Sequence, residues 1–305
     1  MKKAGKLIRL VHNPTAGMGE YSKQKITSLI EKSGYRCSYS SSKRKILKDI
    51  EPETEFIAIA GGDGTIRKVI VKLLDKKLKY KRPIALLPFG TANNIAMSLN
   101  IHEDTAKNIS SWSEYNLKKF DVGQVIGLEK TSYFIESFGL GLFPKLMSVL
   151  KETDTTHVKK PEDEFKLALE KLLKITKYYK AFHFKIEIDD RIIEDECILI
   201  EVMNISSLGP HLKLGKDADP GDGFFDVVIV TDKDRNLMEE YIYGKIDQRK
   251  PEFKIKSIRA KQLKVTASCS NLHVDDEVLK VKTETNLNIS LLDSLIEIVT
   301  GKSAD

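Results

Sequence analysis

The residues best suited to chemistry form a short run, Gly61-Gly62-Asp63-Gly64-Thr65, directly after the apolar segment Phe56–Ala60. Glycines let the backbone turn tightly and approach a ligand, and free amides at the start of a helix attract a phosphate. A carboxylate in the same turn would repel that phosphate unless a magnesium ion or a proton lies between them. Asp63 is therefore a candidate metal or water-relay residue. The alternative is a plain glycine turn in which Asp63 only caps the following helix.

Two more loops of this kind occur in the same half of the chain. One is Asn13-Pro14-Thr15-Ala16-Gly17-Met18-Gly19, and the other is Pro88-Phe89-Gly90-Thr91-Ala92-Asn93-Asn94. Each follows an apolar segment and supplies small residues, hydroxyls and amides before a predicted helix. Three such loops on one edge of a parallel sheet would provide enough donors for a polyphosphate. The sequence contains no Walker loop, and these loops contain no Gly-x-Gly-x-x-Gly fingerprint.

Acidic residues gather in two places further along the chain. Asp219 and Asp222 lie three residues apart in a loop rich in Gly and Pro, where carboxylates, backbone carbonyls and water could coordinate a hard cation. An ordinary acidic turn is the alternative. The second place is the charged turn Asp275-Asp276-Glu277. A carboxylate there could accept the proton of an attacking hydroxyl, provided it lies within hydrogen-bond reach, whereas the alternative is a solvent-exposed hairpin.

Short apolar runs and helical stretches alternate over the first 122 residues and would position the three loops. The predicted strands are Leu7–His12, Tyr35–Ser40, Phe56–Ala60, Ile84–Leu87 and Phe120–Val122. The predicted helices are Tyr21–Ser33, Thr65–Asp75 and Ala92–Leu99. This alternation implies a parallel sheet with helices on both faces, and ligands of such sheets bind where loops leave the carboxyl ends of the strands.

A different pattern follows from about residue 122. Longer runs alternate with period two, at Phe182–Ile188, Cys197–Val202, Phe225–Val230, Lys254–Ile258 and Leu263–Thr266. They predict a mainly antiparallel β-sandwich, interrupted by one helix that begins at Pro161. The polar stretch Lys151–Lys160 before that helix is predicted to be a mobile loop. The expected fold class is therefore α/β: an N-terminal parallel-sheet nucleotide-binding domain followed by a β-sandwich domain.

Composition excludes several classes of protein. The 305 residues include 50 Lys+Arg and 44 Asp+Glu, a net charge of +6, with 41% hydrophobic and 31% charged residues, which excludes disorder, collagen and disulfide scaffolds. Three widely spaced cysteines favour a reducing interior. We find no credible signal peptide and no run of about 18 apolar residues that could span a bilayer. The six histidines lack zinc-ligand spacing and are expected to be structural.

The ordered set of motifs resembles the diacylglycerol kinase catalytic family, which includes bacterial lipid kinases and the sphingosine and ceramide kinases. The set comprises Asn13-Pro14…Gly17, the 61–65 and 88–94 runs, Asp219…Asp222-Gly223 and Asp275-Asp276-Glu277, and it covers nearly the whole chain. The resemblance implies a nucleotide-binding domain at 1–121, a lipid-substrate sandwich at 122–288, and a C-terminal segment of about 289–305 that returns to the first domain. It also implies ATP and Mg²⁺ as cofactors.

The resemblance also implies roles for single residues. Asp63 is similar to the family's essential acidic residue, and Glu277 matches its general-base glutamate. Thr91 and Asn94 resemble residues beneath the nucleotide, and Asp219, Asp222 and the carbonyl of Phe224 resemble a structural magnesium site. The expected nucleotide contacts are Asn13, Pro14, Thr15, Ala16, Gly17, Gly61, Gly62, Gly64, Thr65, Gly90, Thr91 and Asn94.

Two positions depart from the family pattern. Asp276 stands where the family usually has glycine, so the turn could have a different backbone beside Glu277. Asn94 replaces the aspartate of many members, and an amide cannot hold a cation as a carboxylate does. We therefore treat Asn94 as a hydrogen-bonding residue only.

The expected function is ATP-dependent phosphorylation of a hydroxyl on a lipid or lipid-like alcohol, a step of phospholipid metabolism, with Glu277 as base. The expected partners are a lipid substrate and, transiently, a membrane surface, with no nucleic acid; the oligomeric state is open, a homodimer included. The expected location is the cytoplasm, peripheral to the inner membrane surface. Two alternatives remain: an NAD kinase-like phosphotransferase, which would usually carry a Leu-Asn-Glu element that is absent around Asn204, and a noncatalytic nucleotide or lipid sensor.

Overall fold

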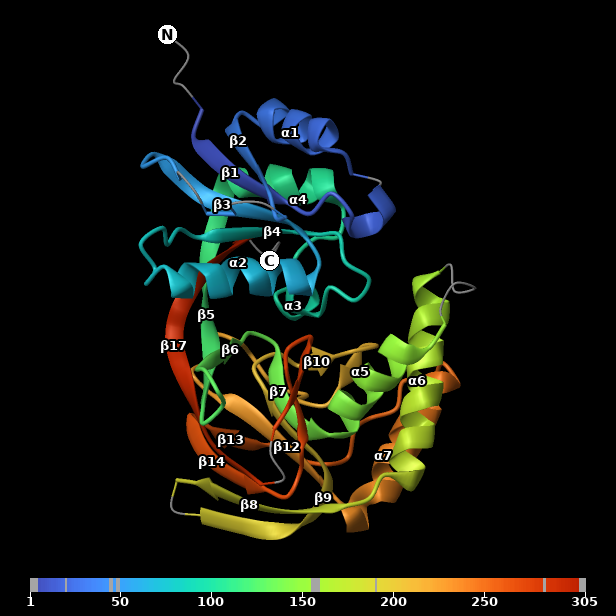
Figure 1. Cartoon of the computed structure of the whole chain (residues 1–305). Coiled ribbons are helices and arrows are strands. Elements are labelled where there is room, and N and C mark those ends of the chain that lie inside the picture. The colour runs from blue at the N-terminus through green and yellow to red at the C-terminus, as the bar shows by residue number, and fades with distance from the viewer. Residues whose placement is uncertain are drawn as a thin grey trace. The chain divides into compact units, whose positions relative to one another are not determined.

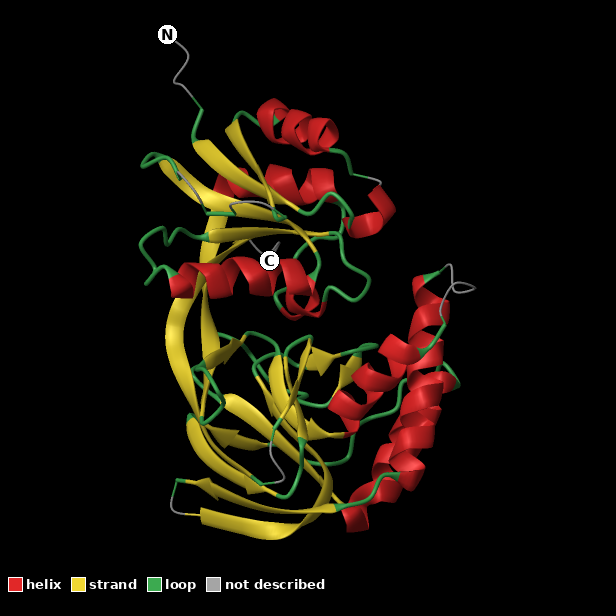
Figure 2. Cartoon of the chain, in the orientation of Figure 1, coloured by secondary structure: helices red, strands yellow, loops and turns green. Residues whose placement is uncertain are grey.

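The computed structural model describes residues 5–19, 21–43, 46–47, 50–154, 160–189, 191–281 and 284–301. The chain forms two compact units, one of residues 1–120 with 294–305 and the other of residues 121–293. Figure 1 follows the chain through both units, and Figure 2 shows the mixed α/β character that the sequence predicts. Two strands, β5 (Tyr115–Ile126) and β17 (Thr285–Gly301), have residues in both units.

The first unit contains a parallel sheet in the order β2-β1-β3-β4-β17. Ile298 and Val299 of β17 pair with Ile84 and Ala85, so the end of the described chain adds a strand to this sheet. All residues of β1 and β4 are buried, as expected for strands covered on both faces. The other strands are β1 (Leu7–His12), β2 (Arg36–Ser41), β3 (Thr54–Gly61) and β4 (Ile84–Pro88).

Helices cover both faces of this sheet. Figure 1 shows α1 and α4 on one face and α2 on the other. On the α1 and α4 side, Ile30 and Ile109 pack in one cluster with Phe56 and Trp112, whose rings meet edge to face at 5.2 Å. The helices are α1 (Lys23–Lys32), α2 (Asp63–Asp75), α3 (Asn94–Ser98) and α4 (Thr105–Ser111), with short 3-10 helices at Ala16–Gly19 and Trp112–Glu114.

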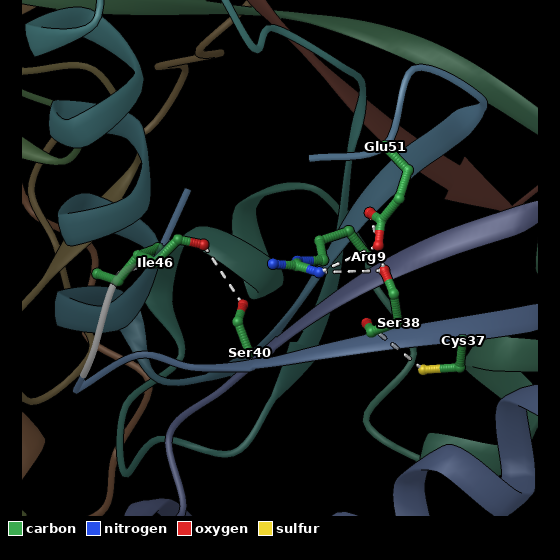
Figure 3. A network of polar contacts seen from close by, with 6 residues as sticks. All are labelled: Arg9, Cys37, Ser38, Ser40, Ile46 and Glu51. Carbon is green, nitrogen blue, oxygen red and sulfur yellow. Dashed lines mark hydrogen bonds and ion pairs between the residues drawn. The ribbon is translucent and has the colours of Figure 1, made fainter. Parts of the chain in front are cut away.

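Polar side chains of β1 and β2 contact Glu51, which lies in the segment before β3 (Figure 3). Nη1 of Arg9 donates to the Ser38 hydroxyl at 3.3 Å and lies 3.5 Å from Oε1 of Glu51. The Ser38 hydroxyl donates in turn to the second oxygen of Glu51 at 3.2 Å. Arg9 is only 9% exposed, so the network compensates for the burial of a charge. Burial also raises the pKa of the neighbouring Cys37 thiol to about 11.

The second unit is mainly antiparallel, in agreement with the sequence. Its longest path runs β16-β15-β7-β9-β8-β14-β17, with β12 between β9 and β13 and with β5 beside β6. The burial of β8 alternates strictly along the strand, as for a sheet with one solvated face. The strands are β6 (Ser132–Phe134), β7 (Ser137–Gly141), β8 (Phe182–Ile188), β9 (Arg191–Met203), β10 (Ser207–Leu208), β11 (Leu212–Lys213), β12 (Phe225–Thr231), β13 (Ile258–Ala260), β14 (Gln262–Ala267), β15 (Asn271–Val274) and β16 (Glu277–Lys280).

In the described part of this unit, three α-helices rather than the one predicted pack on the sheet: α5 (Leu142–Glu152), α6 (Pro161–Tyr178) and α7 (Arg235–Ile246). Helix α6 begins at Pro161, as predicted. Helix α5 was not predicted because Gly141 and Pro144 are residue types typical of loops, although proline is tolerated in a first helical turn. Among the described residues, no helix is long and apolar enough to cross a membrane.

Three local predictions need correction. Phe120–Val122 is predicted as a strand of the parallel sheet, but it lies in β5, which pairs with β17 and antiparallel with β6. Lys254–Ile258 was expected to be a strand, but only Ile258 is in one, because β13 begins there. Lys151 and Glu152 belong to the last turn of α5 rather than to a loop. The core of the predicted mobile loop, residues 155–159, lies outside the described residues.

Candidate functional site

The three predicted loops leave the carboxyl ends of neighbouring parallel strands, β1, β3 and β4, and therefore meet at one edge of the sheet. Backbone hydrogen bonds join them where they leave the strands: Asn13 N donates to the Ala60 carbonyl at 2.8 Å, and Phe89 N donates to the Gly61 carbonyl at 3.0 Å. The Asn13 side chain also donates to the Thr65 hydroxyl at 3.4 Å. The first unit thus brings together the groups that the sequence predicts at this edge.

Gly62 and Gly90 bring two of these loops into backbone contact. A Cβ atom added to Gly62 would lie 2.8 Å from the Cα of Gly90, and one added to Gly90 would lie 2.6 Å from the Cα of Gly62. Neither distance is compatible with a side chain, so glycine is needed here because of close approach. The two loops consequently form one compact backbone surface at the start of α2.

Asn93 fixes the shape of the third loop, a role that the sequence analysis did not assign. Its backbone is left-handed, with φ 52° and ψ 38°. Its side chain closes on Gly90 twice, because Oδ1 accepts from Gly90 N at 2.7 Å and Nδ2 donates to the Gly90 carbonyl at 2.8 Å. The Asn-Asn pair was the available signal, since asparagine tolerates the left-handed region and bonds to nearby backbone.

Asp63 is the first residue of α2, but it does not cap that helix. Gly62 is the N-cap and makes no side-chain cap bond. The Asp63 carboxylate instead accepts from the first amides of α3, from Asn94 N at 2.9 Å and from Ile95 N at 3.2 Å. It therefore links the second and third loops. The helix-capping alternative was right about the type of contact but named the wrong helix.

The predicted nucleotide contacts differ in exposure. Pro14, Thr15, Gly17, Gly64 and Thr91 are exposed, whereas Asn13, Ala16, Gly62, Asp63 and Gly90 are half-buried. Asn94 and Thr65 are buried, at 2% and 8% exposed, and Gly61 is buried against Thr65. The exposed residues can meet a ligand directly, and the buried ones support the loops.

In the second unit, Asp219, Asp222 and Phe224 lie in one tight loop. Oδ1 of Asp219 accepts from Gly221 N, and Oδ1 of Asp222 accepts from Phe224 N, both at 3.0 Å. The other oxygen of Asp222 lies 2.6 Å from Nη2 of Arg259. Carboxylates and carbonyls suit a hard cation, and the exposed Arg259 guanidinium would compete with such a cation for Asp222. Among the described residues, no group of three or more His, Cys, Asp or Glu could hold one.

Glu277 begins β16 directly after a two-residue turn. Val274 and Glu277 pair across the hairpin of β15 and β16, and Glu277 is exposed, as is Asp276. Asp275, not Asp276, adopts a positive φ of 51°. The turn therefore needs no glycine at position 276, and the departure of Asp276 from the family pattern places no strain on the backbone beside Glu277.

The buried Asp275 carboxylate fastens this turn to the segment between β6 and β7. It accepts from three consecutive amides: Ile135 N at 3.0 and 3.1 Å, Glu136 N at 2.8 Å and Ser137 N at 3.2 Å. Asp275 N donates back to the Ser137 carbonyl at 2.9 Å. These amide bonds compensate for the loss of water around the buried carboxylate.

A buried acid and a buried histidine lie beneath the turn. Nε2 of His273 is 2.9 Å from Oε1 of Glu201, and Nδ1 is 2.8 Å from the Asp275 carbonyl. A carbonyl only accepts, so Nδ1 carries a proton. Burial lowers the pKa of His273, but the Glu201 carboxylate and the Asp275 carbonyl raise it more, so the net pKa lies above its ordinary value. The spacing of the histidines predicts only a structural role for His273. The signal for its buried partner is Glu201, a single acidic residue inside an apolar strand.

Comparison with known proteins covers both units. A model of the diacylglycerol kinase catalytic domain matches residues 7–125, and a model of the YegS C-terminal NAD kinase β-sandwich-like domain matches residues 148–291. A diacylglycerol kinase of Staphylococcus epidermidis is 28% identical over 233 residues, 74% of this chain and 70% of the relative. The diacylglycerol kinase of Staphylococcus saprophyticus is 28% identical over 234 residues, 74% of this chain and 73% of the relative.

A solved structure shares the fold. The crystal structure of a diacylglycerol kinase from Bacillus anthracis has a TM-score of 0.70 at 19% identity and covers 100% of both chains. At this identity the likeness concerns the fold alone.

Proposed function

Because the chain belongs to the diacylglycerol kinase catalytic family, for which lipid kinase activity is the general expectation, we propose that it transfers the γ-phosphoryl group of ATP to a hydroxyl of a lipid or lipid-like alcohol. Diacylglycerol is the first acceptor to test, because the Staphylococcus relatives carry that name. The observation that carries the proposal is the set of three loops joined at one sheet edge, with Gly62 against Gly90.

The phosphates of ATP would lie at the start of α2. Gly62 offers no side chain to cap this helix, and the glycine contact with Gly90 keeps Cβ atoms away from the loop surface. Backbone amides at a helix start and the positive end of its dipole favour an anion. Thr91 is exposed at the same edge, and its hydroxyl would add a donor, whereas the Thr15 hydroxyl already donates to Oδ1 of Asn13 at 2.9 Å.

Magnesium would enter with the nucleotide and neutralise charge on the phosphates. Asp63 is the acidic residue of this edge and would face that cation or its water. Its bonds to the first amides of α3 would fix the direction of the carboxylate. A structural magnesium at the 219–224 loop would have to displace the exposed Arg259 from Asp222.

Glu277 would accept the proton of the attacking lipid hydroxyl. It is exposed, so it can meet a substrate, and it follows a turn fixed by Asp275. A general base needs such a fixed position because proton transfer requires hydrogen-bond reach. Reaching the acceptor would require transient contact with the inner membrane surface from the cytoplasm, favoured by the net charge of +6.

The decisive assay uses purified protein, magnesium, γ-labelled ATP and a panel of diacylglycerol, sphingoid bases, phosphatidylglycerol and NAD. Label in a lipid is the expected result. Label in NAD alone would support the NAD kinase-like alternative, whereas ATP binding without any labelled product would support a noncatalytic sensor. A static light-scattering measurement of the same sample would determine whether the protein is a homodimer.

Substituting the base separates chemistry from binding. We expect Glu277→Gln to lower kcat by about 10²- to 10⁴-fold, the usual contribution of a general base, while ATP affinity is unchanged. Asp276→Asn is the matched control, because Asp276 is the adjacent exposed carboxylate of the same turn. A Glu277→Gln enzyme that turned over at the full rate would remove Glu277 from this role.

A further inference from the structure

Three neighbouring strands of the second unit place an acid and a base in one row. Glu201 of β9 is in register with Gly139 of β7, and Gly139 is in register with His273 of β15. Glu201 is fully buried and His273 is 2% exposed. The two side chains meet across the middle strand, where Nε2 of His273 lies 2.9 and 3.1 Å from the two carboxylate oxygens.

The pair can form only because the middle residue is glycine. A Cβ atom at Gly139 would lie 2.0 Å from Oε1 and 2.3 Å from Cδ of Glu201. The backbone of Gly139 does not adopt a positive φ, so the glycine is not needed for a special conformation. The missing side chain therefore makes room for the Glu201 carboxylate.

The other nitrogen of His273 reaches the turn that carries Glu277. Nδ1 donates to the carbonyl of Asp275 at 2.8 Å, and Asp275 is the left-handed residue of that turn. The Asp275 carboxylate is held at the same time by the amides of residues 135–137. Both the backbone and the side chain of Asp275 are thus fixed, and Glu277 follows two residues later.

Stability alone does not explain this arrangement. A buried ion pair is weak evidence for stability, because well-packed apolar residues of similar volume often do as well or better. An apolar pair, however, could not hold the Asp275 carbonyl. The contacts are instead those expected of side chains that hold a turn in one conformation.

We propose that Glu201 and His273 are positioning residues for Glu277, acting through the Asp275 carbonyl to hold the β15–β16 turn in one conformation. This inference rests on the proposed function of Glu277 as general base. Both side chains are buried, so their effect on the reaction would pass through the turn. Gly139 is required for the same arrangement because it leaves space for the Glu201 side chain.

Kinetics of three variants test the proposal: Gly139→Ala, Glu201→Gln and His273→Leu. Small displacements of a reacting group can cost about 10²-fold in rate, so we expect kcat to fall by about 10- to 100-fold while KM for ATP stays within about twofold. His273→Asn, whose amide can still donate to the Asp275 carbonyl, should keep more of the rate than His273→Leu. Ile242→Ala, at a fully buried position on α7, is the control for general loss of stability and should retain kcat at a temperature where it is folded.

The same substitutions in a Glu277→Gln background distinguish positioning from a merely structural role. If the pair acts through Glu277, Gly139→Ala should cause no further loss there. An equal loss in both backgrounds would overturn the proposal, and so would unchanged kcat in all three variants.

The pair can also be observed without substrate. In ¹H–¹⁵N spectra of histidine-labelled protein, we expect both ring nitrogens of His273 to carry protons at neutral pH. The signals of this ring are those that are absent from the spectrum of His273→Leu. We expect the same signals to be altered in Gly139→Ala. A wild-type protein with this signature but no labelled product would contradict the proposed function alone. A neutral, single-proton ring in the wild type would contradict the pair.

Discussion

Three adjacent carboxylates, Asp275, Asp276 and Glu277, have different surroundings although they follow one another in the chain. Asp275 is 6% exposed and accepts bonds from three amides, whereas Asp276 and Glu277 are exposed. A carboxylate fully occupied by backbone amides serves the turn, and an exposed one can meet a substrate. At the scale of the residue, environment rather than residue type therefore assigns structural and chemical roles.

The raised pKa of His273 predicts a pH dependence of stability. Glu201 of β9 and the Asp275 carbonyl face the ring, and Phe143 of α5 packs on it edge to face. The pKa of His273 is higher in the folded state than its unfolded value of about 6.5. The stabilisation that the charged ring contributes is therefore complete below pH 6.5, and it is lost as the pH rises through the folded pKa. We expect the free energy of unfolding to fall by up to about 1.4 kcal/mol per pH unit in this window.

Urea denaturation between pH 6 and 9 measures this slope. The reference is the double variant Glu201→Gln, His273→Gln, which has neither titrating group, so contributions of other residues cancel in the difference. A difference between wild type and double variant that stayed constant with pH would show that folding does not change the pKa of His273 and would contradict this prediction.

The sequence identified the residue types of the site better than their partners. The Gly61–Thr65 run and the Asp275–Glu277 turn could be found because glycine and carboxylate patterns are local. The bond from Asp63 to α3 and the pair of Glu201 with His273 join residues 31 and 72 positions apart. Such contacts depend on strand order and register, which no local pattern contains.

At the scale of the element, the loop from β4 to α3 depends on Asn93. Asn93→Ala removes both side-chain bonds to Gly90 and places alanine in a left-handed conformation. We expect a loss of about 1–3 kcal/mol in the free energy of unfolding and a several-fold weaker ATP affinity, because the loop no longer holds one shape. Calorimetric titration of a nonhydrolysable ATP analogue measures the affinity.

Asn100→Ala is the matched control for this loop. Asn100 also has a positive φ, 53°, but it follows α3 rather than preceding it. We expect it to lose stability by the backbone conformation alone and to bind nucleotide like the wild type. If Asn93→Ala bound the nucleotide as tightly as the wild type, the Asn93 bonds would have no role in nucleotide binding.

The elements of the first unit were predictable because the periodicity of the apolar residues and the glycines at the ends of the elements indicate the same boundaries. Strand β1 was predicted to the residue, and α1 and α2 to within two residues at each end. The helices of the second unit were harder. In α7 the buried residues Met238, Tyr241 and Ile242 follow helical spacing, but the exposed Tyr243 on another face dilutes the pattern.

At the scale of the whole molecule, β17, like β5, has residues in both compact units. The first part of β17 pairs with β14 in the second unit, for example Leu287 with Val265, and its end pairs with β4 in the first, Ile298 with Ile84. Leu287 and Ile298 are both buried, at 1% and 0% exposed. The strand therefore offers a matched pair of core positions, one for each unit.

Substitutions at these two positions test whether the units unfold separately. Truncating a buried Leu or Ile to alanine costs about 2–5 kcal/mol. We expect Ile298→Ala to accelerate amide hydrogen exchange in residues 7–120 and leave residues 121–293 protected, and Leu287→Ala to do the reverse. Exchange followed by mass spectrometry resolves the two regions. Each unit has its own hydrophobic clusters, so a cavity in one should lower the local unfolding free energy of that unit alone. Equal acceleration across both regions by either variant would mean that the units unfold as one cooperative whole, with the shared strand coupling them.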